Sequence, residues 1–296
     1  MILIADAGST KIEWTLLGND RKVALRTVTR GHNAAQADVG SFLRLLQTDA
    51  PALIEKAKGA DEIFYYGAGC AGERATAMSR ILSETFNAAR CHAESDMLGA
   101  ARALCGREAG IACILGTGSN SCLYDGKEIR ANIPPMGFIL GDEGSGAVLG
   151  RRLLGMVMKG GFSAGIVRKF RERFPEATKE EIIARVYRHE RPGAYLASFA
   201  PFLAENIGED EISGFVVEEF IRFFEFNVRG YDTPLRDNAE IFGNPADTTS
   251  VPVSFIGSIA QHFAPQLHEA ASLCGYTINR IEKSPMEALI EFHRGK

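Results

Sequence analysis

The same succession of strands and turns occurs twice in this chain of 296 residues. Each half opens with three consecutive predicted strands: residues 2–5, 11–17 and 23–29 in the first half, and residues 111–116, 119–124 and 128–133 in the second. In both halves a short turn of glycine and hydroxyl residues joins the first strand to the second, and helical patterns follow. The repeat is one of pattern, since the residues of the halves are little alike. It predicts two similar lobes, and ligands usually bind in the cleft between lobes.

The rest of the chain alternates between strand and helix patterns. Strands are predicted at 62–66, 90–93, 253–256 and 276–282, and helices at about 39–58, at 73–87, from 97, over most of 145–229, at 258–273 and from 285. This alternation is typical of an α/β fold whose mostly parallel or mixed sheets are covered by helices. The segment 231–252 is rich in Asp, Pro, Asn and Thr and is predicted to be an irregular loop.

Composition and charge argue against several classes of protein. Apolar residues make up 46% and charged residues 24%, as in soluble globular proteins. A net charge of -4 argues against a nucleic-acid partner. The pair Arg151-Arg152 and the basic residues within 168–173 are predicted to lie on solvated helix faces. No apolar run is long enough to cross a membrane, and the N-terminus reaches Asp6 too soon for a signal peptide. The six cysteines fall in apolar stretches without a CxxC pair, so we expect reduced thiols and a cytoplasmic protein.

The turn in the first half has the composition of a phosphate-binding loop. It follows Asp6, at the end of the first strand, and contains Gly8, Ser9, Thr10 and Lys11. Glycine lets backbone N–H groups approach a phosphate closely, and the two hydroxyls add donors. A carboxylate at the preceding strand end can hold a hydrated Mg²⁺ against the same phosphates. By itself the motif would be better explained as an ordinary hairpin, because Asp, Gly, Ser and Thr are common turn residues.

Two further turns, in the second half, are also built from small residues. The first joins two apolar strands through Gly116, Thr117, Gly118, Ser119 and Asn120. Two such turns, one in each lobe, could hold one polyphosphate from both sides, and chance explains this pair far less easily than either turn alone. The other joins strand 253–256 to a helix through Gly257 and Ser258, where small side chains leave room for an adenosine. Its simpler explanation is a strand-to-helix turn with Ser258 as the N-cap.

In their order along the chain, these turns and the segment Gly141-Asp142-Glu143-Gly144-Ser145-Gly146 resemble those of the actin-like ATPase superfamily. Within it, the chain is similar to the group that joins N-acetylglucosamine kinases with the BadF/BadG/BcrA/BcrD ATPases. The resemblance covers nearly the whole chain and is weakest between about 160 and 250. It implies two RNase H-like lobes around a nucleotide cleft. Residues 1–105 and the terminal helix 285–296 would form one lobe, and residues 106–284 the other.

The resemblance also implies roles for single residues. In the ATP site these are Asp6 for the Mg²⁺ of Mg-ATP, Gly8 to Lys11 and Gly116 to Asn120 for the phosphates, and Gly257 with Ser258 for the adenosine. Asp96, in the pair Ser95-Asp96 at a strand end, matches the catalytic base of related sugar kinases and would contact the sugar. Asp142 and Asn33 match residues that bind the sugar. Gly69 and Gly137 lie in glycine-containing loops that are expected to approach it.

Asp96 and Asp142 have simpler explanations as well. Each precedes a predicted helix, where Asp is a common N-cap. Glu143 would lie in the first turn of the helix after Asp142, where a negative charge interacts favourably with the helix dipole. For Asp96 the two roles are compatible, because phosphoryl transfer mainly needs alignment, Mg²⁺ and a carboxylate to accept the hydroxyl proton. For Asp142 function is favoured, because its loop begins with Pro134-Pro135 and carries three glycines that bring the backbone close to a ligand.

One motif points to another class of protein. Gly67-Ala68-Gly69-Cys70-Ala71-Gly72 fits GxGxxG after strand 62–66, and Glu94 follows at the spacing seen in dinucleotide-binding folds. A lobe that opens with three meandering strands does not fit such a fold, and the paired turns would remain unexplained. We expect these glycines instead to let the loop approach the sugar or the Asp96 loop.

Together these features predict an ATP-dependent kinase that uses Mg²⁺ and phosphorylates the 6-hydroxyl of an N-acetylated amino sugar. N-acetylglucosamine is the first candidate, with N-acetylmuramic acid and glucosamine as alternatives, and the resemblance suggests a homodimer. An ATPase that activates 2-hydroxyacyl-CoA dehydratases is a rival, but such activators carry a cysteine where this chain has Gly141–Gly146. A non-catalytic sugar-binding or scaffold ATPase is a second rival, although ATPase cores of that kind are longer.

Overall fold

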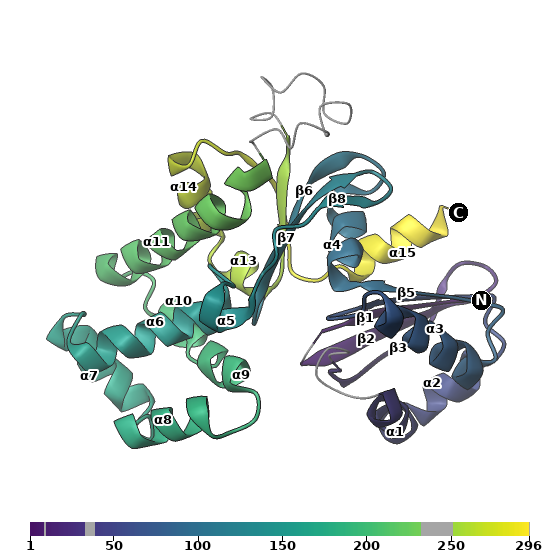
Figure 1. Ribbon diagram of the computed structural model, residues 1–296, viewed down its shortest axis with the longest axis horizontal. Helices are drawn as coiled ribbons and strands as arrows, with labels where there is room; N and C mark the ends of the chain where they lie inside the picture. The colour runs from purple at the N-terminus through teal and green to yellow at the C-terminus, as the bar shows by residue number, and fades with distance from the viewer. Residues whose placement is uncertain (9, 33–38, 232–250, 296) are drawn as a thin grey trace. The chain divides into compact units, whose positions relative to one another are not determined.

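The computed structural model of the protein describes residues 1–8, 10–32, 39–231 and 251–295 (Figure 1). By its contacts the chain divides into two units, which are described separately. Unit 1 consists of Met1–Glu108, Gly126–Glu128 and Ser284–Lys296. Unit 2 consists of Ala109–Asp125 and Ile129–Lys283.

The sheet of unit 1 has five strands in the order β3-β2-β1-β4-β5. Their bounds are β1 Ile2–Ala7, β2 Lys11–Leu17, β3 Val23–Arg30, β4 Glu62–Gly67 and β5 Arg90–Ser95. The first three strands form an antiparallel meander, and β4 and β5 then continue parallel to β1. The apolar run at the N-terminus is therefore the central strand, paired on both sides.

Helices cover both faces of this sheet: α1 Val39–Asp49, α2 Pro51–Lys56, α3 Glu73–Phe86, α4 Asp96–Cys105 and α15 Met286–Arg294. On one face, Trp14, Phe42, Tyr65 and Phe86 form the centre of a buried cluster with side chains from α1, α2 and α3. On the other face, α4 and α15 lie side by side (Figure 1). The last helix of the chain thus belongs to the first sheet.

The sheet of unit 2 repeats this topology in the order β10-β9-β6-β7-β8. Its strands are β6 Ala109–Leu115, β7 Ser119–Asp125, β8 Ile129–Ala131, β9 Val253–Ile256 and β10 Ile278–Glu282. Again three strands form an antiparallel meander, and two later strands pair parallel to the first. The prediction of two α/β lobes built on one pattern is confirmed.

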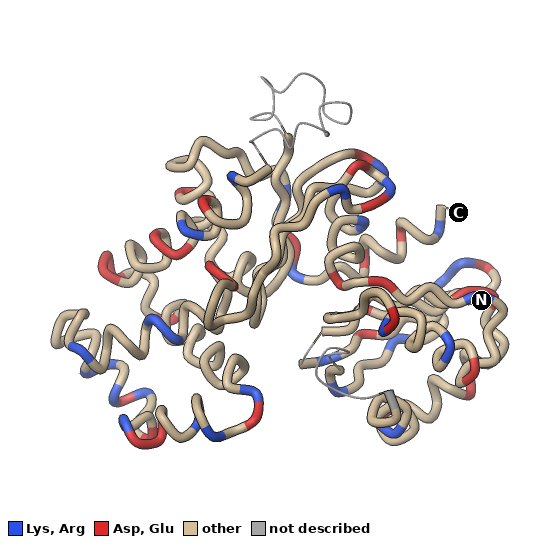
Figure 2. The backbone as a smooth tube through the Cα atoms, viewed as in Figure 1, with Lys and Arg blue, Asp and Glu red and all other residues tan. Residues whose placement is uncertain are grey.

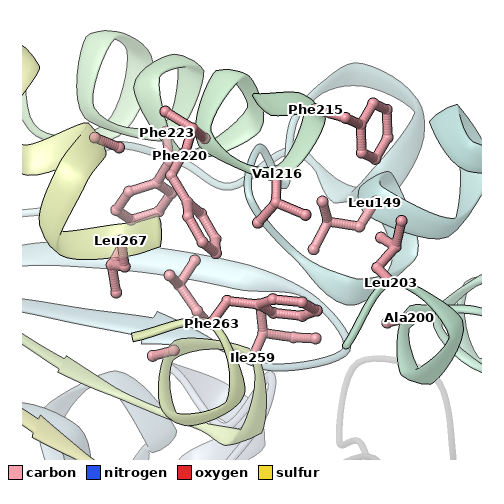
Figure 3. Close-up of a cluster of buried hydrophobic side chains, with 14 of the residues drawn as sticks. Leu149, Ala200, Leu203, Phe215, Val216, Phe220, Phe223, Ile259, Phe263 and Leu267 are labelled. Carbon is pink, nitrogen blue, oxygen red and sulfur yellow. The ribbon is translucent and has the colours of Figure 1, made fainter. Parts of the chain in front are cut away.

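Most of the helical residues described belong to unit 2. The elements are α5 Gly137–Leu140, α6 Gly146–Lys159, α7 Ala164–Arg173, α8 Lys179–Tyr187, α9 Pro192–Ala197, α10 Ala200–Glu205, α11 Asp210–Asn227, the 3-10 turn Arg229–Tyr231, α13 Ser258–His262 and α14 Ala264–Leu273. Figure 3 shows Phe220 and Phe223 of α11 meeting Phe263 and Leu267 in the core of the unit. Because each such side chain stabilises the fold by about 1.5–3 kcal/mol when fully buried, this cluster is a main source of the stability of unit 2.

Two predicted helices are each divided in the structure. The predicted helix 39–58 ends at Asp49 and restarts at Pro51, and the predicted helix 258–273 is divided between His262 and Ala264. Proline lacks an N–H group and clashes with the preceding turn, so Pro51 and Pro265 stand in the first turn of a new helix and not inside a longer one. Of the predicted irregular loop 231–252, residues 232–250 lie outside the described part.

Lys and Arg are interspersed with Asp and Glu along the described backbone (Figure 2). The four basic residues of α7 are exposed, and Lys169 and Arg173 pair with Glu209 and Glu205, at 2.6 Å and 3.2 Å. The predicted solvated helix face is therefore confirmed for α7. For Arg152 of α6 it is wrong, because this side chain is half-buried and pairs with the buried Glu219. The six cysteines are free thiols. Within the described ranges, no helix combines the length and the apolar character that a membrane span requires.

Candidate active site

The carboxyl ends of three parallel strands lie side by side in unit 1. The register pairs Ala7 of β1 with Gly67 of β4, and Gly67 with Ser95 of β5. The residues that follow these strands therefore emerge at one edge of the sheet, the edge where α/β proteins usually bind ligands. Asp6 and Asp96 are both brought to this edge.

Asp6 is a half-buried carboxyl group in an acidic environment. Burial, Glu13 and Asp96 raise its pKa to about 7, and Lys11 opposes them. Glu13 faces Asp6 across the β1–β2 hairpin and forms an ion pair with Lys11. The sequence analysis did not single out Glu13, although the register of a tight hairpin would have placed it opposite Asp6. The Gly8 N–H closes this hairpin on the carbonyl of Lys11, at 3.0 Å.

Asp96 is the first residue of α4 and does not cap it. The N-cap is Ser95, whose Oγ accepts a hydrogen bond from the Leu98 N–H at 3.2 Å. The Asp96 Oδ1 accepts one from the Met97 N–H at 2.9 Å, and burial raises the pKa of this carboxyl above its ordinary value. Because Ser95 has the capping role, helix capping does not explain why an aspartate stands at position 96.

Helix α4 is fixed tightly against the sheet. A side chain at Gly99 would come within 2.8 Å of Tyr66, so only glycine lets the helix approach this closely. Farther along, Arg102 donates to the Tyr66 hydroxyl at 2.8 Å, and that hydroxyl also lies 2.8 Å from the His293 Nε2 of α15. These contacts fix the direction in which Asp96 is presented.

The loop 67–72 is not part of a dinucleotide-binding fold. Gly69 has a φ of +70°, and Gly72 is the N-cap of α3 with a φ of +55°. The strand that precedes the loop belongs to a sheet with an antiparallel meander, which a dinucleotide-binding unit lacks. The loop instead follows β4 at the same edge as Asp6 and Asp96. Ser9 and Asn33, two of the predicted site residues, lie outside the described residues.

In unit 2, the second glycine turn is joined to the start of α6. The Gly116 N–H bonds to the Gly118 carbonyl at 2.9 Å. The first N–H groups of the helix, those of Gly146 and Ala147, donate to the carbonyls of Gly116 and Thr117 at 2.8 Å and 3.0 Å. Ser119 is buried at the start of β7. The Asn120 Oδ1 accepts from the Asn132 Nδ2 at 2.9 Å, so this side chain has a partner within the protein.

Asp142 lies against this turn in a strained conformation. Its φ of +56° is unusual for a residue other than glycine, and a side chain at Gly118 would lie 3.1 Å from its Oδ2. Burial and Glu143 raise the pKa of Asp142 to about 6, while backbone hydrogen bonds from Ser119 and Gly137 oppose them. Strain of this kind persists where the surrounding structure enforces it, often at functional sites.

The backbone around Asp142 explains how it is held. Its N–H donates to the Pro135 carbonyl at 2.9 Å. A side chain at Gly141 would come within 2.1 Å of that same carbonyl, so the loop can close only through glycine. The N-cap of α6 is Ser145, whose Oγ accepts from the Val148 N–H at 3.2 Å, and not Asp142.

A third turn follows β9, and it lies at the same edge of the unit 2 sheet as the turn after β6, because β9 runs parallel to β6. Gly257 has a φ of +124°, and a side chain there would come within 2.2 Å of the Leu115 carbonyl. Gly257 is the N-cap of α13, and Ser258 is its first residue. The simpler explanation of Ser258 as the N-cap is therefore wrong.

Both units have the same strand order and carry their glycine turns at the carboxyl ends of the parallel strands. They are two RNase H-like lobes, and together they define an actin-like ATPase fold. The model of the BadF/BadG/BcrA/BcrD ATPase family matches residues 5–207. The chain belongs to this family.

Solved structures agree with this fold. A candidate N-acetylglucosamine kinase from Porphyromonas gingivalis is 40% identical over 100% of this chain and 99% of its own, with a TM-score of 0.90. A second candidate N-acetylglucosamine kinase, from Chromobacterium violaceum, is 18% identical over 98% of both chains, with a TM-score of 0.73. A glucokinase of the ROK family from Streptomyces griseus, in complex with glucose and AMPPNP, is 12% identical over 98% of this chain and 97% of its own, with a TM-score of 0.52. The last two likenesses show the fold alone. No curated protein matches the chain.

Proposed function

We propose that this protein transfers the γ-phosphate of ATP to the 6-hydroxyl of an N-acetylated amino sugar, with N-acetylglucosamine as the first candidate. At the coarser level, its family and the 40%-identical relative from Porphyromonas gingivalis make the chain an ATP-dependent sugar kinase. The observation that carries the finer proposal is the placement of Asp6 and Asp96 at one sheet edge, both with raised pKa values and neither capping a helix. The 40% identity to a candidate N-acetylglucosamine kinase supports the choice of sugar.

The residues around Asp6 fit a magnesium ion. Asp6, Glu13 and Asp96 bring three carboxyl groups near one ammonium group, that of Lys11. Burial is the main cause that raises the pKa of Asp6 to about 7, and the charges of Glu13 and Asp96 add to it. Within the described part of the chain, no three His, Cys, Asp or Glu side chains form a metal site by themselves. Mg²⁺ bound with a nucleotide needs only one or two carboxylates, because phosphate oxygens and water complete its shell. We propose that Asp6 holds the ion, which when bound neutralises charge on the transferred phosphate.

The glycine turns are the proposed nucleotide-binding residues. We assign Gly8, Ser9, Thr10 and Lys11 in unit 1, and Gly116, Thr117, Gly118, Ser119 and Asn120 in unit 2, to the phosphates. We assign Gly257 and Ser258 to the adenosine. At Gly257 the positive φ and the close Leu115 carbonyl exclude any side chain, which keeps this stretch of backbone bare for a flat base.

Two carboxylates are proposed to bind the sugar. We propose that Asp96 accepts the proton of the 6-hydroxyl, because burial raises its pKa and so strengthens it as a base. Asp142, with a pKa of about 6, is mostly ionised at pH 7 and can accept hydrogen bonds from sugar hydroxyls. Asn33, Gly69 and Gly137 are proposed as further contacts with the sugar.

Replacing the proposed base tests the role of Asp96. We expect Asp96→Asn to bind ATP and sugar with affinities near those of the wild type, while kcat falls roughly 100- to 10,000-fold. Asp49→Asn is the matched control, because Asp49 pairs with Arg30 at the protein surface, and its activity should be unchanged. Undiminished phosphoryl transfer by Asp96→Asn would remove this residue from the base role.

A substrate panel tests the activity itself. ATP consumption would be measured with N-acetylglucosamine, N-acetylmuramic acid and glucosamine against a sugar-free control. We expect N-acetylglucosamine to stimulate turnover most, and the amino-sugar assignment is wrong if none of the three does. The activator of 2-hydroxyacyl-CoA dehydratases stays the rival, but the segment 141–146 contains no cysteine, so we expect a purified protein without iron. We also propose a homodimer, which light scattering of the purified protein would test.

A further inference from the structure

One buried asparagine bonds to two segments of unit 2 that the proposed function uses. Asn227 is the last residue of α11, and its side chain is only 2% exposed. Its Nδ2 donates to the Glu143 Oε2 at 3.0 Å, next to Asp142. Its backbone carbonyl accepts from the Ser121 Oγ at 2.6 Å, next to Asn120.

The segment 133–143, which presents Asp142, has limited apolar packing, in which Ile133 and Phe138 lie partly buried against the core. In α5 no residue is buried, and Ile139 and Leu140 are 71% and 73% exposed. Asp142 itself has a left-handed backbone conformation that costs free energy for a residue other than glycine. Polar contacts therefore help to hold the conformation of this segment.

These polar contacts lie within the segment and at both of its ends. Within it, the Arg151 Nη1 donates to the Phe138 carbonyl at 2.6 Å. At the start, the Ile133 N–H donates to the Tyr231 hydroxyl at 3.0 Å, and that hydroxyl lies 2.8 Å from the Ser121 Oγ. At the end, the Glu143 side chain is tied to the Asn227 amide. Hydrogen bonds to charged groups are among the stronger ones in proteins, and a buried partner makes their loss costly.

We propose that Asn227 is a positioning residue for the sugar site: through Glu143 it holds the strained Asp142 carboxyl in the orientation that binds the sugar. The proposal rests on the proposed function, because it takes Asp142 as the sugar ligand. Asn227 acts through Glu143 and does not touch the substrate.

Exchanging the amide and the carboxylate between positions 227 and 143 distinguishes loss of their hydrogen bond from general loss of the fold. Asn227→Asp would place two carboxylates against each other, and we expect the KM for N-acetylglucosamine to rise about tenfold while the KM for ATP stays within about twofold. Adding Glu143→Gln to that variant restores one amide and one carboxylate with their places exchanged. We expect this double variant to recover a sugar KM within about threefold of the wild type.

A control and a second measurement complete the test. Asn206→Asp removes another amide hydrogen bond of unit 2, the one to the Phe202 carbonyl, and should leave the sugar KM unchanged. Hydrogen exchange of the amides in 135–145, measured without ligands, should quicken in Asn227→Asp and slow again in the double variant.

The outcomes separate the two proposals. A folded Asn227→Asp with wild-type sugar KM and wild-type exchange overturns the positioning role. So does a double variant that recovers the exchange but not the KM. If the wild type phosphorylates no sugar, the proposed function fails, and the exchange measurement still decides whether Asn227 holds this segment.

Discussion

Three carboxyl groups with raised pKa values are the three to which the proposed function assigns chemistry. Asp6, Asp96 and Asp142 are half-buried, and burial is the largest cause of each shift. In contrast, Asp49 and Asp61 at the surface have pKa values lowered by basic partners. Carboxyl groups buried at sheet edges, where elements end, destabilise the ligand-free fold, and such residues are concentrated in functional sites.

This cost makes stability depend on pH at Asp6. Its folded pKa of about 7 lies above the ordinary value of 3.8 for an aspartate, so its contribution to stability is full below about pH 4 and is lost as pH rises through 7. We therefore expect Asp6→Asn to raise the free energy of unfolding of the ligand-free protein at pH 8 by on the order of 1–3 kcal/mol, and to have little effect at pH 4. Urea denaturation at both pH values measures the difference.

The matched control, Asp49→Asn, is expected to change the free energy of unfolding in the opposite direction. The Arg30 guanidinium lowers the pKa of Asp49, so this carboxylate stabilises the fold at neutral pH and loses its effect as pH falls. Asp49→Asn should therefore be less stable than the wild type at pH 8, with a difference that shrinks in acid. If Asp6→Asn behaved in the same way as Asp49→Asn, the burial argument would fail.

Removal of the hydroxyl group is expected to affect stability differently at two neighbouring tyrosines of β4. The Tyr66 hydroxyl bonds to Arg102 and His293, whereas the buried Tyr65 hydroxyl has no hydrogen-bond partner among the described residues. We expect Tyr66→Phe to lower the free energy of unfolding by about 1–3 kcal/mol, and Tyr65→Phe to leave it unchanged or raise it by about 1 kcal/mol. Chemical denaturation of the two variants side by side is the measurement, and equal losses would contradict the assignment.

At the scale of elements, the sequence predicts where strands lie better than where helices end. The apolar runs and glycine turns located all ten strands found among the described residues, because strand burial and turn chemistry are local signals. The helix ends depend on single residues: Ser95 and Ser145 are the caps, although Asp96 and Asp142 were equally plausible by type. The choice between them depends on tertiary contacts that no local pattern contains.

Two glycines of α6 have different reasons to be there. A side chain at Gly150 would come within 1.8 Å of the Leu196 carbonyl in α9, whereas one at Gly155 would meet nothing within 4 Å. We expect Gly150→Ala to lower the free energy of unfolding by about 3 kcal/mol through overpacking. Gly155→Ala should raise it by about 0.5–1 kcal/mol, because alanine favours the helix. Thermal unfolding of the two variants checks both signs, and similar melting temperatures would contradict the close helix contact.

At the scale of the whole molecule, the internal repeat made the fold predictable, and the family resemblance supplied the candidate site. What the sequence could not predict are contacts between distant segments. Glu143 meets Asn227 across 84 positions, and Tyr66 meets His293 across 227. The strained backbone of Asp142 could not be predicted either, because an aspartate in a glycine-rich loop does not by itself indicate a positive φ.

The C-terminal helix allows a prediction about how the chain is assembled. Helix α15 follows unit 2 in the sequence but packs on unit 1, where Met286, Leu289 and Ile290 are buried. His293 is fully buried and stacks on Phe64, with ring centroids 3.8 Å apart. At about 1.5–3 kcal/mol for each buried apolar side chain, removing the helix would cost an amount comparable to the entire stability of a domain.

We therefore expect a chain that ends at Ser284 to lose the fold of unit 1, while a chain that lacks only its last two residues folds normally. The single tryptophan, Trp14, is 1% exposed in the core of unit 1, so its fluorescence reports on this unit alone, while circular dichroism reports on both. Truncation at Ser284 should shift the tryptophan emission toward that of a solvated indole, while the helical signal of unit 2 persists. Buried-type emission in the truncated chain would show that unit 1 forms without its last helix.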